Sequence, residues 1–189
     1  MITVNPFVDN VLQITPAYIQ GFLILMVIFT VGGVILDMMH KKNVKFFFNN
    51  AKKAKLSATK SVSTGEKAAI IVKTLAHDVA TSAEFCGVTR RITHLLGMYG
   101  TILFWVSSAV MIFSASSTST IYPMLWHIGA IMTCVGGYWF WFIQRVDVRA
   151  EGNNWSRIVF ADLFVLSLVT TSTFGLLWSY FQSANSNGL

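Results

Sequence analysis

Residues 17–39 read AYIQGFLILMVIFTVGGVILDMM, a run in which Asp37 is the only charged side chain. A helix of about 20 apolar residues crosses the hydrocarbon core of a bilayer, so this run predicts a transmembrane helix. Three further runs have a similar length and character: Leu95–Ser116, Ile121–Ile143 and Val159–Phe181. Because 54% of the 189 residues are hydrophobic and only 12% are charged, a soluble enzyme with a buried core is excluded. The sequence predicts an all-α integral membrane protein with four transmembrane helices.

The basic residues predict the orientation of these helices. Eleven of the 14 Lys and Arg residues lie between His40 and Thr93, and the other three lie between Gln144 and Arg157. Loops rich in Lys and Arg stay in the cytoplasm, so both segments are expected on the cytoplasmic side of a bacterial inner membrane, with both termini outside. The expected organisation is an outer tail (1–16), a first transmembrane helix (17–39), a basic cytoplasmic loop (40–94), three transmembrane helices (95–181) and a second outer tail (182–189).

The cytoplasmic loop begins with HKKNVKFFFNNAKKAK, residues 40–55, in which lysines flank three phenylalanines. This pattern is typical of a segment at the membrane surface, with its aromatic rings among the headgroups and its lysines against anionic lipid. The same charge would attract an acidic soluble partner, whereas no nucleic-acid-binding fold is present and nucleic acid is not expected. The residues predicted to contact lipid or partner are Lys41, Lys42, Lys45, Lys52, Lys53 and Lys55.

A second cytoplasmic helix is predicted after a Ser/Thr-rich linker. Ser63 followed by Glu66 forms a capping-box pattern, which opens a helix expected to run to about Phe85. Its apolar residues fall on one face, so the helix is amphipathic and either lies on the membrane or docks a partner. His77 falls on the polar face and is expected to be solvated.

Ionisable side chains within or beside the transmembrane runs are candidate functional residues, because burial in lipid is costly unless they are paired or hydrated. Asp37, His127 and Asp162 lie within these runs, and His40 and His94 lie at their cytoplasmic ends. With a rise of about 1.5 Å per residue, His94 and His127 are at different depths and cannot ligate one haem iron. His40 and His94 are at matching depths, so they are either a haem-ligating pair or two interfacial anchors.

The remaining polar groups at depth each have a structural and a functional interpretation. His127 would hydrogen-bond a neighbouring helix, a quinone carbonyl, or ligate a haem together with a partner's ligand. Asp37 and Asp162 lie within reach of basic residues, so ion pairs are expected, with proton handling as the alternative. Glycines of the third run predict a close approach to neighbouring helices: Gly129, Gly136 and Gly137.

An ordered set of residues in the second half of the chain resembles a known family. The spacing Cys-x3-Arg-x3-His-x4-Tyr-Gly leads into the second run, as Cys86, Arg90, His94, Tyr99 and Gly100. Gln144-Arg145 ends the third run, and Asp162-x-Phe164 precedes Thr173-x-Gly175 in the fourth. This order resembles the haem-b membrane subunits of the quinone-interacting oxidoreductase complex and, more distantly, the nitrate reductase gamma subunit. The size and four-span layout are most similar to the membrane anchor of dissimilatory adenylylsulfate reductase.

The resemblance implies a subunit that docks a cytoplasmic flavin and iron–sulfur oxidoreductase to the membrane and passes electrons between it and the quinone pool. In that family the partner converts sulfite and AMP to adenylylsulfate, and the quinone receives the electrons. Larger relatives carry further haem-ligating histidines after the Asp…Thr-x-Gly helix, whereas the last histidine of this chain is His127. Only His94 matches a family histidine.

Two functional hypotheses follow. In the first, the chain is an electron-transfer anchor that binds quinone between its helices, and haem b if His40 and His94 form an axial pair. The polar residues expected around the quinone are His94, His127, Asp162, Asp37 and Arg91. In the second, the chain is a purely structural, haem-free anchor for a cytoplasmic redox enzyme. A channel or transporter is disfavoured because no inverted repeat or interrupted helix pair marks a polar path.

Overall fold

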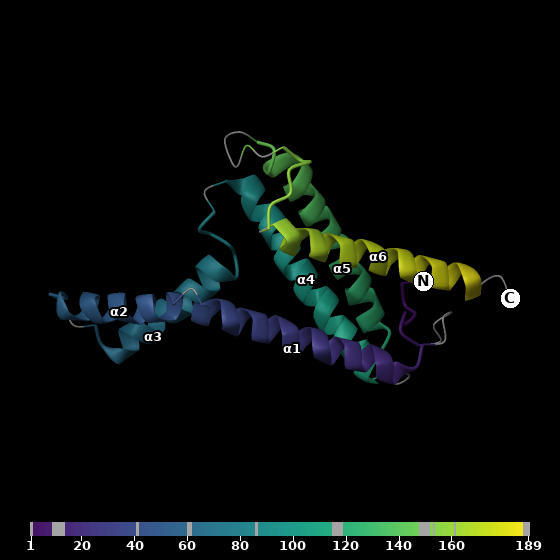
Figure 1. The fold of residues 1–189 in the computed structure, drawn as a ribbon, viewed down its shortest axis with the longest axis horizontal. Coiled ribbons are helices and arrows are strands. Elements are labelled where there is room, and N and C mark those ends of the chain that lie inside the picture. Colours follow the sequence, from purple (N-terminus) through teal and green to yellow (C-terminus); the bar gives the residue numbers. More distant parts are fainter. Residues whose placement is uncertain are drawn as a thin grey trace.

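The computed structural model describes residues 2–8, 14–40, 42–59, 62–85, 87–114, 119–147, 152, 154–160 and 162–186. Within these ranges the chain forms helices and their connections without a strand, so the all-α prediction is confirmed there. In chain order the elements are α1 (Pro16–His40), α2 (Asn43–Leu56), α3 (Thr64–Lys73) with a π-helical continuation η1 (Thr74–Val79), α4 (Val88–Ser114), α5 (Ile121–Trp139) with a π-helical continuation η3 (Phe140–Gln144), and α6 (Asp162–Ser186) (Figure 1).

Three of the described helices are long and apolar enough to span a membrane: α1, α4, and α6 as far as Ala184. They correspond to the first, second and fourth predicted runs. The third run is also helical, because α5 continues directly into η3, but it does not belong to this group of three. Tyr122, Pro123 and His127 lower its mean hydropathy, and its α-helical part ends where η3 begins. The structure therefore supports membrane association through three helices.

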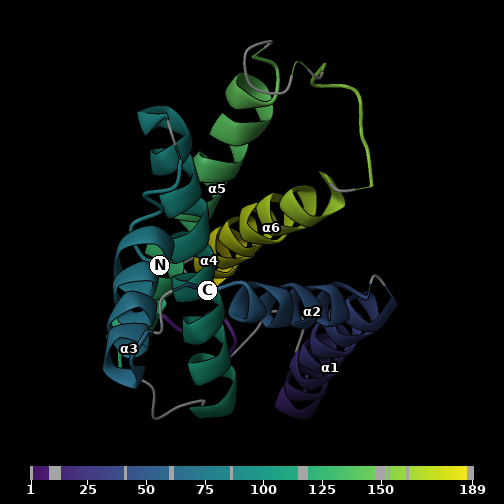
Figure 2. The same cartoon turned by 90° about the vertical axis from the view of Figure 1, so that its left-hand side faces the viewer.

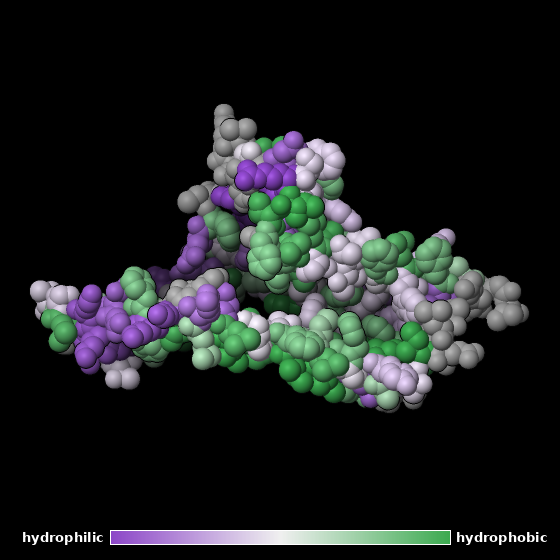
Figure 3. All heavy atoms as spheres, in the orientation of Figure 1, coloured by the Kyte–Doolittle hydropathy of each residue, from purple (hydrophilic) through white to green (hydrophobic). Residues whose placement is uncertain are grey.

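Helix α1 is apolar on all of its faces and is hardly covered by the rest of the protein. Only Leu23 is buried along its 25 residues. The side chains of Phe22, Phe29 and Leu36 are 67, 74 and 68% exposed, and Figure 3 shows apolar atoms along this helix. A helix that is hydrophobic all round needs apolar surroundings. Since protein does not cover α1, a lipid environment is the one that suits it.

Helices α4 and α5 are in backbone contact at glycines. A Cβ atom added to Gly129 of α5 would lie 2.5 Å from the backbone nitrogen of Phe104 and 2.7 Å from the carbonyl oxygen of Gly100, both on α4. On α4, a Cβ atom at Gly100 would lie 2.6 Å from the backbone nitrogen of Thr133. Interfaces between membrane helices use small residues in this way. The predicted close approach at Gly129 is therefore confirmed.

The buried core lies between α4 and α5, toward the end where α4 stops and α5 starts. It consists of Phe104, Met111, Trp126 and Ala130, with Phe7 and Leu176 packed against it. The N-terminal segment joins this end of the molecule, because Asn5 Nδ2 donates to the Met111 carbonyl at 3.3 Å and Trp178 Nε1 donates to the Pro6 carbonyl at 3.1 Å. Residues 2–8 and the last turns of α6 consequently lie on the same side of the molecule (Figure 1).

The helix ends differ by a few residues from the ends of the predicted transmembrane runs. Helix α4 begins at Val88, so the predicted 40–94 loop includes the first two turns of this helix. Helix α6 begins at Asp162 and continues to Ser186, into the predicted outer tail. The physical reason is that hydropathy marks where a helix enters lipid, whereas backbone hydrogen bonding and capping determine where it begins and ends.

The segment between α2 and α4 contains the predicted capping box, but the helix that the box opens is shorter than predicted. Ser63 Oγ accepts the Glu66 backbone N–H at 3.2 Å, and Glu66 Oε2 accepts the Ser63 backbone N–H at 2.8 Å. Helix α3 with η1 ends at Val79 rather than near Phe85. The chain leaves the helix there because residues 80–82 hydrogen-bond to side chains of α4 instead.

Candidate functional site

A cavity of about 550 Å³ lies between α4, α5 with η3, and α6. It is near the end where α4 begins and η3 stops, which is opposite to the buried core. Most of its walls are apolar or glycine. The lining residues are Phe85, Arg90, Thr93, His94, Gly97, Met98, Thr101, Ile102, Thr133, Gly136, Gly137, Phe140, Gln144, Phe164, Val165, Leu168 and Val169. The volume and the apolar lining suit a small lipophilic molecule.

The polar lining of the cavity is concentrated in the first turns of α4 and the last residue of η3. Gln144 is buried, and its Nε2 donates to Thr93 Oγ1 at 2.7 Å. Thr93 Oγ1 in turn donates to the Thr89 carbonyl at 2.8 Å, so the Gln144 amide is held in place from α4. Arg90 and His94 complete this group. Polar groups on one side of an apolar cavity can orient a ligand that has one polar end.

His94, the residue that matches the family motif, is oriented by the segment before α4. Its Nδ1 lies 2.9 Å from Ser82 Oγ. The imidazole also packs against the Phe85 ring, with 4.8 Å between ring centroids. Its Nε2 has no hydrogen bond within the described ranges, so this nitrogen is available to a ligand.

Of the two consecutive arginines at the start of α4, Arg90 lines the cavity and Arg91 does not. Arg90 is part of the lining, whereas Arg91 Nε donates to the Thr81 carbonyl at 2.7 Å. Arg91, which the sequence analysis places near the quinone, is therefore not part of this cavity's lining.

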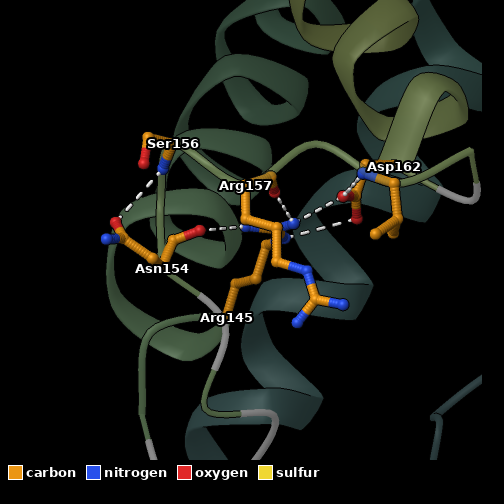
Figure 4. Close-up of polar contacts among 6 residues, drawn as sticks. Arg145, Asn154, Ser156, Arg157 and Asp162 are labelled. Carbon is orange, nitrogen blue, oxygen red and sulfur yellow. Dashed lines mark hydrogen bonds and ion pairs between the residues drawn. The ribbon is translucent and has the colours of Figure 1, made fainter.

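Asp162 is held in a buried ion pair at the edge of the site and does not line the cavity. Arg145, whose side chain is fully buried, donates from Nη2 to Asp162 Oδ2 at 2.5 Å and from Nε to Oδ1 at 3.3 Å. The guanidinium also donates to the carbonyls of Asn154 and Arg157 (Figure 4). Its central carbon lies 4.3 Å from the centroid of the Trp141 ring. The ion pair expected for Asp162 is present, and it fixes the loop before α6.

His127 makes the interhelical hydrogen bond that the sequence left as one of three alternatives. Its Nε2 lies 2.8 Å from Ser179 Oγ on α6, and its Nδ1 lies 2.7 Å from the Pro123 carbonyl. The residue is buried beside Trp126 and is not part of the cavity lining. Both ring nitrogens are already hydrogen-bonded, so His127 ties α5 to α6.

The structure does not assemble His40 and His94 into a pair. His40 is exposed at the last residue of α1, as is Asp37 one turn earlier. The end of α1 and the start of α4 lie apart in both Figure 1 and Figure 2. The structure thus gives no support for these two histidines as ligands of one haem iron, and the pairing stays a prediction. Among the described residues, no group of three or more His, Cys, Asp or Glu side chains is placed to hold a metal ion.

The predicted lysine cluster is exposed on and before α2. Lys42 precedes the helix with a left-handed backbone, and every described side chain of α2 is exposed. Figure 3 shows hydrophilic side chains over this end of the molecule. Phe46, Phe47 and Phe48 are 69, 68 and 64% exposed among them. Lys41 and Cys86 lie outside the described residues.

Sequence reasoning missed Ser82, Thr93 and Gln144 as parts of the site. In the sequence, Gln144 stands out only as part of the Gln144-Arg145 pair in the family resemblance, and Thr93 only as the end of the basic segment that begins at His40. Ser82 gave no signal at all, because its contact with His94 depends on how the chain turns after η1.

No family model, curated protein or solved structure matches this chain.

Proposed function

We propose that this chain is the membrane subunit of an electron-transfer complex and that it binds a quinone in the cavity between α4, η3 and α6. The observation that carries the proposal is the cavity itself, which combines about 550 Å³ of largely apolar space with Arg90, His94 and Gln144. Quinones are lipophilic rings with two carbonyl oxygens. Such a ligand needs apolar walls for the ring and a few donors for an oxygen, and this lining offers both.

When bound, a quinone supplies a group that accepts two electrons and two protons. The chain's own residues would bind and orient it. His94 has Nε2 free to donate to or accept from a ligand oxygen. Arg90 places a permanent positive charge in the same lining, which favours negative charge on a nearby oxygen. Gln144, fixed by Thr93, limits how a ligand can lie at this end.

The proposal includes a topology of four membrane-spanning segments with α5 and η3 as the third. Arg90, Arg145 and Arg157 all lie toward the end of the molecule at which α4 begins and η3 stops. The N-terminal segment contacts α6 at the other end. This separation supports a cytoplasmic position for the cavity and an outer position for both termini in a bacterial inner membrane.

The proposed partner is a cytoplasmic flavin and iron–sulfur oxidoreductase similar to adenylylsulfate reductase. What supports docking is the exposed basic surface of α2, formed by Lys42, Lys45, Lys52, Lys53 and Lys55. Such a surface attracts acidic proteins as well as anionic lipid headgroups. Docking here would bring the partner to the same face of the membrane as the cavity.

The test of the quinone site is a binding titration. The chain in lipid nanodiscs is titrated with decylubiquinone and with a short-chain menaquinone, and the quenching of tryptophan fluorescence is followed. We expect saturable binding that is weakened by His94→Gln, because the ligand loses a hydrogen-bonding nitrogen. The matched control is His77→Gln, whose imidazole lies on the exposed η1. Equal, non-saturable quenching in wild type and His94→Gln would contradict the site.

A dithionite-reduced minus oxidised visible spectrum of the assembled complex addresses haem b. The separation of the ends of α1 and α4 predicts no b-type signal that is lost in both His40→Ala and His94→Ala. A signal of that kind would overturn the placement of these two residues. A flat spectrum together with absent quinone binding would leave the haem-free structural anchor as the function.

A further inference from the structure

The segment Ala80–Phe85, here called the strap, is fastened across the first turns of α4. Tyr99 Oη donates to the Ala80 carbonyl at 2.6 Å, and Arg91 Nε donates to the Thr81 carbonyl at 2.7 Å. Ser82 Oγ and His94 Nδ1 are 2.9 Å apart. The strap ends in Phe85, which lies in the cavity lining and packs on His94. It therefore connects the cytoplasmic helices directly to the candidate site.

Ser82 has an unusual backbone for a residue of its type. Its φ is 51°, which is in the left-handed region, and its side chain is only 3% exposed. A non-glycine residue in this region is held by its surroundings, since the conformation is sparsely populated and such residues cluster at functional sites. The hydrogen bonds on both sides of Ser82 provide that restraint. Its hydroxyl is consequently held against His94 from a fixed backbone.

We propose that Ser82 is a positioning residue that fixes the ring orientation and tautomer of His94 for ligand binding. This inference rests on the proposed quinone site. A neutral imidazole has one donor and one acceptor nitrogen, and the partner of one nitrogen decides the role of the other. When the Ser82 hydroxyl donates to Nδ1, the proton of His94 resides on Nε2. The free Nε2–H then donates to a carbonyl oxygen of the ligand.

The left-handed backbone supplies a clean variant. Ser82→Gly removes the hydroxyl while glycine tolerates this φ, so the strap can keep its path. The matched control is Ala83→Gly, which adds the same freedom to the next residue without removing a hydrogen bond to His94. Ser82→Asn is the rescue variant, because Asn also tolerates the left-handed region and carries a hydrogen-bonding side chain.

The experiment uses the full chain in nanodiscs, labelled with ¹⁵N-histidine, and records the imidazole nitrogen shifts of His94. His94→Gln identifies these signals by their loss. We expect one Nε2–H tautomer in wild type and Ala83→Gly, and a mixture of tautomers in Ser82→Gly. In the same samples we expect Ser82→Gly to weaken decylubiquinone or menaquinone binding by about three- to tenfold, the range for one hydrogen bond, with partial recovery in Ser82→Asn.

The outcomes separate this inference from the function on which it rests. If His94→Gln binds both quinones as wild type does, the quinone site itself is wrong. If His94→Gln weakens binding but Ser82→Gly does not, the site stands and the positioning role of Ser82 is overturned. Unchanged His94 nitrogen shifts in Ser82→Gly overturn it as well. If Ser82→Gly does not fold, wild-type shifts and binding in Ser82→Asn decide for the role, and their loss decides against it.

Discussion

Arg145 and Asp162 form a buried, two-point ion pair between the residue that follows η3 and the first residue of α6, with 2.5 Å between Nη2 and Oδ2. Both elements that it joins contribute walls to the cavity: Phe140 and Gln144 from η3, and Phe164 and Val165 from α6. The same guanidinium donates to the carbonyls of Asn154 and Arg157, which precede α6 (Figure 4). This pair therefore determines how α6 starts beside the site.

Arg145→Met or Asp162→Leu alone should lower the midpoint of thermal unfolding in nanodiscs, because each leaves one buried charge without its partner. The double variant Arg145→Met with Asp162→Leu should recover part of the loss, since no unpaired charge remains. The measurement is the unfolding midpoint across the double-mutant cycle. Additive losses would show that the two side chains do not interact as the structure indicates.

Gly129→Ala should destabilise the protein by about 1–3 kcal/mol, because its new methyl group would press on the α4 backbone at Phe104. The matched control is Gly32→Ala in α1, where an added Cβ meets nothing within 4 Å. Chemical unfolding in mixed micelles would measure both. Equal stability of the two variants would contradict the close contact of α4 and α5.

Ser179→Ala should destabilise by about 1 kcal/mol, because His127 Nε2 would lose its partner on α6 while remaining buried. Ser167→Ala is the control on the same helix, since Ser167 is exposed and bonds only to the Phe164 carbonyl one turn earlier. Quinone affinity should not change in either variant, as neither residue lines the cavity. A loss of affinity in Ser179→Ala would mean that His127 also serves the ligand.

Leu168→Trp should reduce quinone affinity by roughly tenfold or more while the protein stays folded, because the larger side chain fills space that the ligand needs. Leu163→Trp is the control: Leu163 is 49% exposed on the same helix and outside the lining. The nanodisc titration measures both variants. Unchanged affinity in Leu168→Trp would place the ligand somewhere other than this cavity.

Replacing Lys52, Lys53 and Lys55 together by Glu should weaken association with the cytoplasmic partner, and more at 50 mM than at 300 mM salt. Charges that are exposed on α2 act through solvent, so added ions screen them. The corresponding Gln variant should lie between wild type and the Glu variant. Co-purification of the partner from membranes is the measurement, and salt-independent recovery would count against electrostatic docking.

Local sequence patterns predicted the helices well because they depend on neighbouring residues. The apolar run at 17–39 became α1, and Ser63 with Glu66 formed the capping box of α3. Gly129 also lies against the backbone of α4, which is the close helix approach that its position in an apolar run predicted. The ends of the helices were less predictable. The first turns of α4 contain three residues that were expected in a loop or at its edge: Arg90, Arg91 and His94. Hydropathy does not show how far a helix extends beyond its apolar run.

The candidate site was only partly predictable. The motif resemblance singled out His94, and the structure places it in the cavity lining. Asp162 and His127 stood out in the sequence as ionisable residues within apolar runs. In the structure each bonds to a residue of another segment, Arg145 and Ser179, and so has a structural role. Choosing between ligand contact and structural tie requires the position of a second helix, and the one-dimensional pattern does not contain it.

The length and hydropathy of the apolar runs were enough to predict a helical protein with membrane-spanning character, because both act through contacts between a segment and its surroundings. Which polar residues share a site depended instead on the packing of the helices. Ser82 meets His94, and Gln144 meets Thr93, through packing between segments that are 12 and 51 residues apart. Such long-range juxtapositions depend on how the strap turns and how closely glycines let α4 and α5 approach, and no local pattern encodes that geometry.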